Sequence, residues 1–267
     1  MMSACSPPGP VEGMAIAAAE YPAAADAAGC PVGSKMGQAG ASDDLQTPEG
    51  IGYNVRTPSN YRPDFAHPLL VVFPPAGASA KKNEAFTHLT TEATRRGFVV
   101  AYTAHRKLSP EVVSQLAKVP ADVSARWCID LKRVYATGHS DGGTASHAVA
   151  VLPETRGTVA GIAPSAAGFT HKDLDAYACP VPLPVMIMHN GDDRLFPGWG
   201  KETASWWAVC NHCDLSSPPQ RDKEGCLVYP GCAAPLSYCE KQGGHSDWPG
   251  MGVAIVERLL SSAVATK

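Results

Sequence analysis

The tetrapeptide Gly-His-Ser-Asp occurs twice in the chain, at residues 138–141 and at residues 244–247. Each copy contains a hydroxyl, an imidazole and a carboxylate, the three groups that hydrolytic enzymes use as nucleophile, general base and orienting acid. Residues that are adjacent in sequence rarely point at one another, so neither copy is expected to form a complete site by itself. The surroundings of each copy must therefore decide its role.

The first copy, in RVYATGHSDGG, fits the pattern G-x-S-x-G between a predicted strand and a predicted helix. Such a turn lifts the serine hydroxyl clear of the sheet and requires small residues two positions before and after it. Gly138, Gly142 and Gly143 meet that need. Ser140 is therefore the candidate nucleophile, and the backbone N–H of Asp141 is a candidate oxyanion donor at a helix N-terminus. A plain Gly-Ser turn is the alternative.

The second copy, in KQGGHSDWPG, fails this test because Trp248 stands where the second small residue should be. Its histidine follows the last predicted strand, and a chain order of nucleophile, acid and base makes His245 the candidate base. The acid should lie between them, where HNGDDRLFP offers Asp192 and Asp193. A solvated loop histidine and a polar turn are the alternatives.

The elements that must position these residues follow an alternating pattern. Strands are predicted at 51–58, 68–75, 98–103, 132–138, 158–166, 183–190 and 234–242. Helices are predicted at 83–97, 109–127, 141–152, 200–210 and 251–264. This alternation predicts an α/β fold with a mostly parallel sheet, helices on both faces and no separate lid domain.

The chain is predicted to divide into a tail and one domain. Residues 1–48 are rich in Ala, Gly and Pro and predict a partly ordered tail or linker, whereas 49–267 form the catalytic domain. The first strand, at 51–58, is expected at an edge of the sheet. Ser109 should cap the helix at 109–127, and Pro120 should break or kink it.

The composition excludes several classes of protein. A net charge of −3 lacks the basic footprint of a nucleic-acid binder, and 45% hydrophobic residues argue against global disorder. No apolar run is long enough for a transmembrane helix. Nine cysteines, five of them within 210–239, favour disulfides in an oxidising compartment. A zinc site is the alternative, but the spacing there matches no ribbon or finger.

The ninth cysteine is Cys5, in MSAC followed by SPPGPVEG. This stretch resembles the end of a bacterial lipoprotein signal, in which Cys5 would carry a lipid anchor. A free thiol is the alternative. We therefore expect a secreted, periplasmic or cell-surface protein.

Taken together, the motifs resemble the poly(3-hydroxybutyrate) depolymerase, feruloyl esterase and acetylxylan esterase group of the α/β-hydrolases. RVYATGHSDGG is similar to the family's RVYxTGxSxGG, and HNGDDRLFP is similar to HGTxDxxVPY, with Asp193 on the acid and Pro197 on the proline. GGHSDWPG is similar to GGGHxWPG, with His245 on the base and one extra residue before WPG. The resemblance runs from about residue 50 to the C-terminus.

The chain departs from the family at the oxyanion loop. FPPAGAS (73–79) stands where LHGCGGS is usual, so Pro74 and Pro75 replace His-Gly. Pro75 has no N–H, and by position the second oxyanion donor would be the backbone of Ala76.

The cysteines fit the family as well. Cys213, Cys232 and Cys239 resemble the family's cysteines before the histidine loop, which favours disulfides over zinc. The pairing stays open. One geometric guess is Cys128–Cys179, because both cysteines precede strands that should be neighbours.

The resemblance implies a serine esterase that acts through an acyl-enzyme and needs no cofactor. Feruloyl-type esters of plant polysaccharide are the expected substrates. A polyester such as poly(3-hydroxybutyrate) is the alternative, and a non-catalytic binding protein is a remote one. We expect a monomer whose partner is an ester substrate, including polymeric esters, and not nucleic acid.

The candidate substrate-binding residues are Trp199, Trp248 and His139, although on the turn His139 should point away from Ser140. Trp206 is a further candidate for the wall of the acyl site. Helix packing is the alternative for Trp206 and for its neighbour Trp207.

Overall fold

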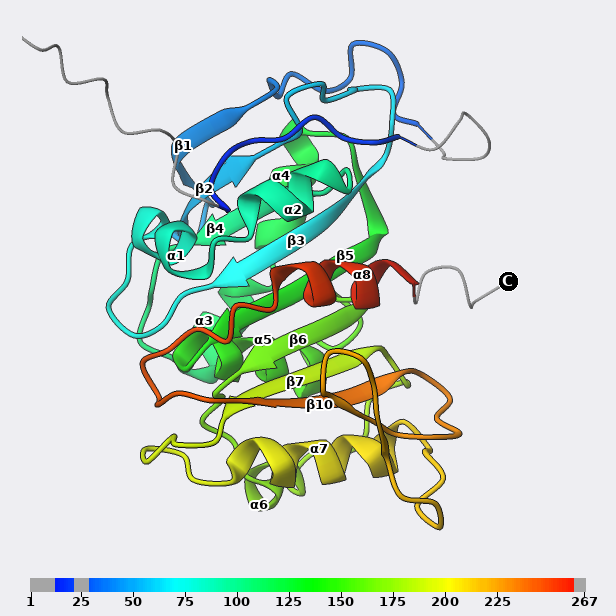
Figure 1. Ribbon diagram of the computed structural model, residues 1–267. Helices are drawn as coiled ribbons and strands as arrows, with labels where there is room; N and C mark the ends of the chain where they lie inside the picture. The colour runs from blue at the N-terminus through cyan, green and yellow to red at the C-terminus, as the bar shows by residue number, and fades with distance from the viewer. Residues whose placement is uncertain (1–12, 22–28, 262–267) are drawn as a thin grey trace, which may run out of the picture.

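A mixed sheet runs through the computed structural model, which describes residues 13–21 and 29–261 (Figure 1). In this described part the sheet has ten strands in the order β1-β2-β4-β3-β5-β6-β7-β10-β9-β8. The central strands from β4 to β10 pair in parallel, and the outer strands pair antiparallel. The predicted α/β fold with a mostly parallel sheet is therefore confirmed.

The strands are β1 (Ala41–Gln46), β2 (Gly52–Arg56), β3 (His67–Phe73), β4 (Val99–Thr103), β5 (Ile129–His139), β6 (Gly161–Ser165), β7 (Val185–Asn190), β8 (Gln220–Arg221), β9 (Leu227–Val228) and β10 (Leu236–Lys241). The helices are α1 (Ala80–Thr87), α2 (Thr90–Arg95), α3 (Pro110–Leu116), α4 (Val119–Arg126), α5 (Asp141–Val151), α6 (His171–Leu174), α7 (Trp199–Cys210) and α8 (Gly252–Ser261).

The apolar strand β3 shows why helices cover both faces of the sheet. All seven of its residues are buried. Successive side chains of a strand point to opposite faces, so a strand that is apolar throughout needs a core on each side. Leu69 and Val71 pack in a core with α3, α4, α5 and α7, whereas Leu70 and Val72 pack in a core with α1, α2 and α8. Figure 1 shows α8 on the opposite side of the sheet from α5.

The edge of the sheet lies in the segment predicted as tail or linker. β1 pairs antiparallel with β2, so the predicted edge strand at 51–58 is an inner strand, and that prediction is wrong. β1 is polar and mostly exposed, so its sequence has no alternation of apolar and polar residues from which a strand could be predicted. Arg56 of β2 bonds Asp43 of β1 and the buried Glu84 of α1, which ties the edge to the helix layer.

Two predicted helices are each divided in two. The segment 83–97 forms α1 and α2, because His88 between them adopts a left-handed conformation with φ 52°. The segment 109–127 forms α3 and α4. The Ser109 side chain accepts a hydrogen bond from the Val112 N–H, as predicted for an N-cap. The break comes just before Pro120, which lies in the first turn of α4, where proline is tolerated.

Within the described residues, four disulfides confirm the disulfide interpretation of the cysteines: Cys30–Cys128, Cys179–Cys210, Cys213–Cys232 and Cys226–Cys239. The predicted pair Cys128–Cys179 is wrong. These two cysteines precede β5 and β7, and β6 lies between those strands. Strands two positions apart are separated by roughly 9–10 Å, beyond the reach of a disulfide.

Cys5, the candidate lipid site, lies outside the described residues. No helix among the described residues is long and apolar enough to cross a membrane. The Cys-rich stretch 211–233 contributes the short strands β8 and β9, which extend the sheet beyond β10.

The length of the chain enclosed by each disulfide predicts its contribution to stability. The sequence separation is 98 for Cys30–Cys128 and 19 for Cys213–Cys232. We expect removal of the first pair by Cys→Ala substitution to lower the free energy of unfolding by about 1.5 kcal/mol more than removal of the second, because a longer closed loop restricts the unfolded chain more. Urea unfolding of both double variants measures the difference. An equal or smaller loss for the Cys30–Cys128 pair contradicts the expectation.

Candidate active site

Ser140 lies on the turn between β5 and α5, in a backbone conformation that is rare for residues other than glycine. Its φ is 57° and its ψ is −117°. Positive φ costs free energy in an L-residue, so the surrounding structure must impose it. The Ser140 N–H donates to the Ser165 carbonyl at the end of β6, and the Thr144 N–H donates to the Ser140 carbonyl. These bonds hold the serine at the carboxyl ends of the strands.

The three glycines around Ser140 are there because backbone passes too close for a side chain. A Cβ at Gly138 would lie 2.4 Å from the Phe73 carbonyl oxygen, and one at Gly142 would lie 2.1 Å from the same atom. A Cβ at Gly143 would lie 2.3 Å from the Ser165 carbonyl oxygen. The requirement for small residues that was inferred from the sequence thus corresponds to contact with the ends of β3 and β6.

Ser140, His245 and Asp193 form a connected hydrogen-bond relay. The His245 Nε2 lies 2.9 Å from the Ser140 Oγ, and its Nδ1 lies 2.8 Å from the Asp193 Oδ2. With Nδ1 protonated, the imidazole donates to the carboxylate and offers Nε2 as an acceptor for the serine proton. The arrangement can therefore deprotonate the hydroxyl and stabilise the imidazolium that forms.

Asp193, and not Asp192, occupies the acid position. The Asp193 side chain is fully buried, and its Oδ1 accepts the N–H groups of Leu195 and Phe196. Burial by itself would raise the pKa of Asp193, but the hydrogen bonds from His245, Phe196 and Leu195 outweigh it and lower the pKa. Asp192 is exposed, and its N–H donates to the Gly243 carbonyl. The carboxylate at the relay is thus held ionised.

His139 is not placed to bind substrate, which corrects the sequence prediction. It is only 1% exposed, and its two ring nitrogens contact the Ser165 Oγ at 3.0 Å and the His245 carbonyl oxygen at 2.6 Å. Burial lowers the pKa of His139 to about 4, so the ring is neutral at pH 7. His139, from the first tetrapeptide, therefore holds the backbone of His245, from the second, in place.

The loop that carries His245 is also held by Asn190 and Asp247. The Asn190 Nδ2 donates to the carbonyls of Gly244 and Asp247, and the Asp247 carboxylate accepts the Gly244 N–H. Ser246 is exposed to solvent. Asn190 was not among the sequence candidates, although its place at the end of the strand before Asp193 could have indicated it.

One aromatic pair packs against His245 and a second packs against His139. Phe196 and Trp199 stack with ring centroids 4.5 Å apart, and Phe196 packs edge-on against His245 at 4.8 Å. Phe86 and Trp248 pack against each other and against His139. Of the sequence candidates, Trp199 and Trp248 thus lie near the relay, and both are half-buried. Phe86 and Phe196 were missed because apolar residues in such segments carry no motif.

The candidate oxyanion donors lie at the start of α5 and in the loop after β3. The Asp141 carboxylate contacts the His105 Nε2 at 2.9 Å, and the His105 N–H donates to the Ala78 carbonyl. Ala76 lies two residues earlier in that loop, in an exposed turn. His105 was not among the sequence candidates. It connects the β5–α5 turn around Ser140, here called the elbow, with the loop that contains Ala76.

Trp206 and Trp207, by contrast, are away from the relay. Trp207 is fully buried and donates from its Nε1 to the His147 Nδ1. Trp206 is 8% exposed and packs edge-on against Trp207. The helix-packing interpretation holds for Trp207. Within the described residues, no group of three or more His, Cys, Asp or Glu side chains is arranged to hold a metal ion.

Comparison with known structures shows that the fold of this chain is a known one. No family model matches the chain. Acetyl xylan esterase from Aspergillus awamori superimposes with a TM-score of 0.63 at 17% identity, over 81% of this chain and 96% of that one. A thermophilic esterase from Thermogutta terrifontis superimposes with a TM-score of 0.53 at 12% identity, over 85% of this chain and 90% of that one. The fold is therefore that of the α/β-hydrolases.

A curated relative points to the same group. Feruloyl esterase B of Piromyces equi is 24% identical over 241 residues, which are 77% of this chain and 44% of that protein. The chain thus spans less than half the length of this relative. The predicted resemblance to esterases of the α/β-hydrolase fold is confirmed.

The close approach at Gly142 predicts a large effect of a single methyl group. Gly142→Ala should lower the free energy of unfolding by about 3 kcal/mol, because the backbone of β3 cannot move away without breaking sheet pairing. Gly52→Ala is the matched control, since its Cβ would meet its nearest neighbour at an ordinary 3.6 Å. Chemical denaturation measures both. Equal stability of the two variants would show that the elbow tolerates displacement.

Proposed function

We propose that the protein is a carboxylic-ester hydrolase that acts through an acyl-enzyme on Ser140. The observation that carries this proposal is the relay itself, in which one imidazole lies within hydrogen-bond distance of both a strained elbow serine and a buried carboxylate. A non-catalytic protein would have no need to maintain this strain, which costs free energy.

The proposed reaction has two symmetrical halves. The Ser140 Oγ attacks the ester carbonyl carbon while the His245 Nε2 takes the hydroxyl proton, and Asp193 stabilises the imidazolium. The N–H groups of Asp141 and Ala76 bind the oxyanion. His245 then gives the proton to the leaving alcohol as the C–O bond breaks. Water, deprotonated by the same imidazole, releases the acid and restores Ser140.

We propose esters of plant polysaccharide as the substrate class, in particular feruloyl-type esters. The names of the relatives, a feruloyl esterase and an acetyl xylan esterase, favour this class. The stacked Phe196–Trp199 pair beside His245 offers a flat apolar surface for an aromatic acyl group. The four disulfides favour secretion or a periplasmic location.

The two tetrapeptides predict opposite results for the same substitution. Ser140→Ala should lower kcat for p-nitrophenyl acetate by at least about 10⁴-fold, because it removes the nucleophile. Ser246→Ala should retain most of the activity, since Ser246 is exposed and outside the relay. Steady-state kinetics on the purified variants measure both.

The adjacent aspartates provide a second matched pair within the same test. Asp193→Asn should cost far more activity than Asp192→Asn. Retained turnover in Ser140→Ala would remove the proposed mechanism.

A panel of methyl ferulate, acetylated xylan and poly(3-hydroxybutyrate) then ranks the substrates, and preference for the polyester would overturn the proposed substrate class.

His105 is proposed as a positioning residue for the oxyanion hole, since it bonds both Asp141 and the loop that carries Ala76. His105→Ala should lower kcat by roughly 10-fold or more with little change in KM, because the donors act mainly on the transition state. His105→Gln, which keeps a side-chain donor, should recover part of the loss. Equal loss in both variants, or a parallel loss of melting temperature, would indicate a merely structural role.

A further inference from the structure

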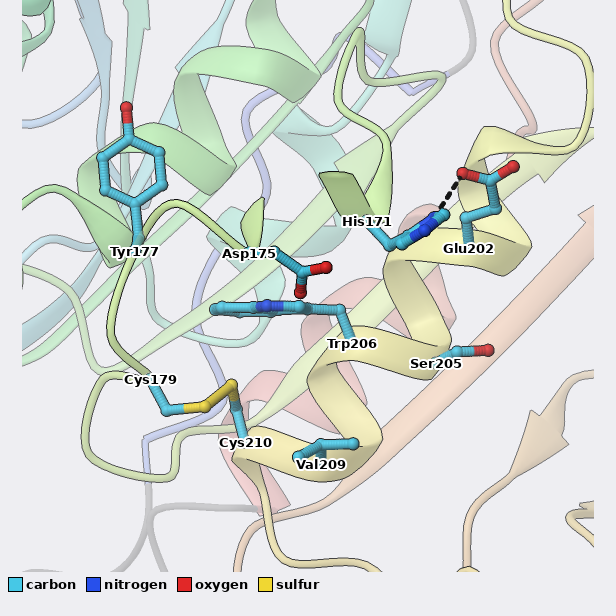
Figure 2. A pocket seen from close by; sticks show the side chains of 9 residues that line it. All are labelled: His171, Asp175, Tyr177, Cys179, Glu202, Ser205, Trp206, Val209 and Cys210. Atoms are coloured by element: carbon cyan, nitrogen blue, oxygen red, sulfur yellow. Dashed lines mark hydrogen bonds and ion pairs between the residues drawn. A yellow bond between two sulfur atoms is a disulfide. The ribbon is translucent and has the colours of Figure 1, made fainter. Parts of the chain in front are cut away.

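A cavity lies between α6 and α7, outside the hydrogen-bond relay. It has a volume of about 530 Å³ and includes among its lining residues Trp206, Asp175, His171 and Glu202. Figure 2 shows the indole of Trp206 between the Asp175 carboxylate and the Cys179–Cys210 disulfide, with His171 bonded to Glu202. Nothing in the proposed ester chemistry uses these groups.

One helix, α7, runs from the aromatic wall of the active site to the cavity. α7 begins at Trp199, whose ring stacks on Phe196 beside His245. Glu202 and Trp206 follow at positions three and seven after Trp199, spacings that share a helix face. At a rise of 1.5 Å per residue, Trp206 lies about 10 Å further along the helix axis than Trp199. A chain-like substrate that reaches from the Phe196–Trp199 pair to Trp206 therefore covers about 10 Å along the helix.

The chemistry of the lining fits a neutral sugar. The half-buried ring of Tyr177 and the exposed edge of Trp206 line the cavity and offer apolar surface to the face of a pyranose. The carboxylates of Asp175 and Glu202 can accept hydrogen bonds from the sugar hydroxyls. The Ser205 hydroxyl, on the same helix, adds a group that can donate or accept. Two carboxylates would repel a uronate or a phosphate. The disulfide fixes the C-terminal end of α7 to the segment after α6, so the cavity is held in place when empty.

We propose that this cavity is a subsite for the neutral saccharide chain of a polysaccharide ester, separate from the acyl site. The inference rests on the proposed function and adds where the alcohol side of the substrate binds. Contacts there raise affinity for polymeric esters without touching the reacting bond, and small esters cannot use them.

The test fills the cavity from exposed positions of α7. Val209 is 58% exposed and Ser205 is exposed, and both line the cavity, so Ser205→Trp and Val209→Trp should fill it without disturbing the core. Ala125→Trp, at an exposed position of α4 away from the cavity, is the matched control. Xylotetraose, a neutral oligosaccharide, is the probe. Its binding to the full chain is measured by calorimetry.

We expect xylotetraose to bind the full chain and the Ala125→Trp control equally, and both filling variants to bind at least 10-fold more weakly. For acetylated xylo-oligosaccharide the filling variants should raise KM, whereas kcat/KM for p-nitrophenyl acetate should not change.

Two results overturn the inference while leaving the proposed function intact. One is hydrolysis of p-nitrophenyl acetate without xylotetraose binding, and the other is binding that neither filling variant weakens. Absence of all ester hydrolysis would instead remove the proposed function, and the binding measurement would still decide whether the cavity takes a sugar.

Discussion

The contact between the end of β3 and the turn after β5 is the constraint on which the site depends. The Phe73 carbonyl lies so close to Gly138 and Gly142 that neither position has space for a Cβ. This packing fixes the turn in which Ser140 has a positive φ of 57°. Together with the hydrogen bonds of Ser140 to Ser165 and Thr144, it sets the direction of the hydroxyl and the position of the first N–H groups of α5.

The other half of the site is built on a loop, and its geometry depends on neighbours from distant parts of the chain. Asn190, Asp247 and His139 each bond the backbone of the loop around His245. Loops position side chains less firmly than strands or helices do, so these bonds supply the rigidity that a relay of 2.8–2.9 Å contacts needs. Asp193 is fixed by two N–H groups of its own turn.

The disulfides and α7 link the site to the outer parts of the molecule. Cys179–Cys210 closes the far end of α7, and Trp199 at the near end stands beside the relay. One helix thus connects the aromatic wall with the cavity around Trp206. Cys226–Cys239 ties the short-stranded extension to β10, the strand that precedes the His245 loop.

Much of this architecture could be predicted from sequence because it depends on local patterns. The strand, the G-x-S-x-G turn and the following helix were recognisable, since the turn needs glycine at defined positions. The chain order of Ser140, Asp193 and His245 was also recognisable, and the structure brings these residues together. The strand β1 escaped detection because an exposed polar edge strand has no apolar alternation.

The tertiary structure alone decided how distant groups pair. The sequence determined which cysteines were available, but the strand order, with β6 between β5 and β7, excluded Cys128–Cys179. The sequence also indicated that His139 should point away from the neighbouring Ser140. Only the fold showed that His139 supports His245, 106 residues later, because hydrogen bonds between buried groups depend on spatial position and not on sequence distance.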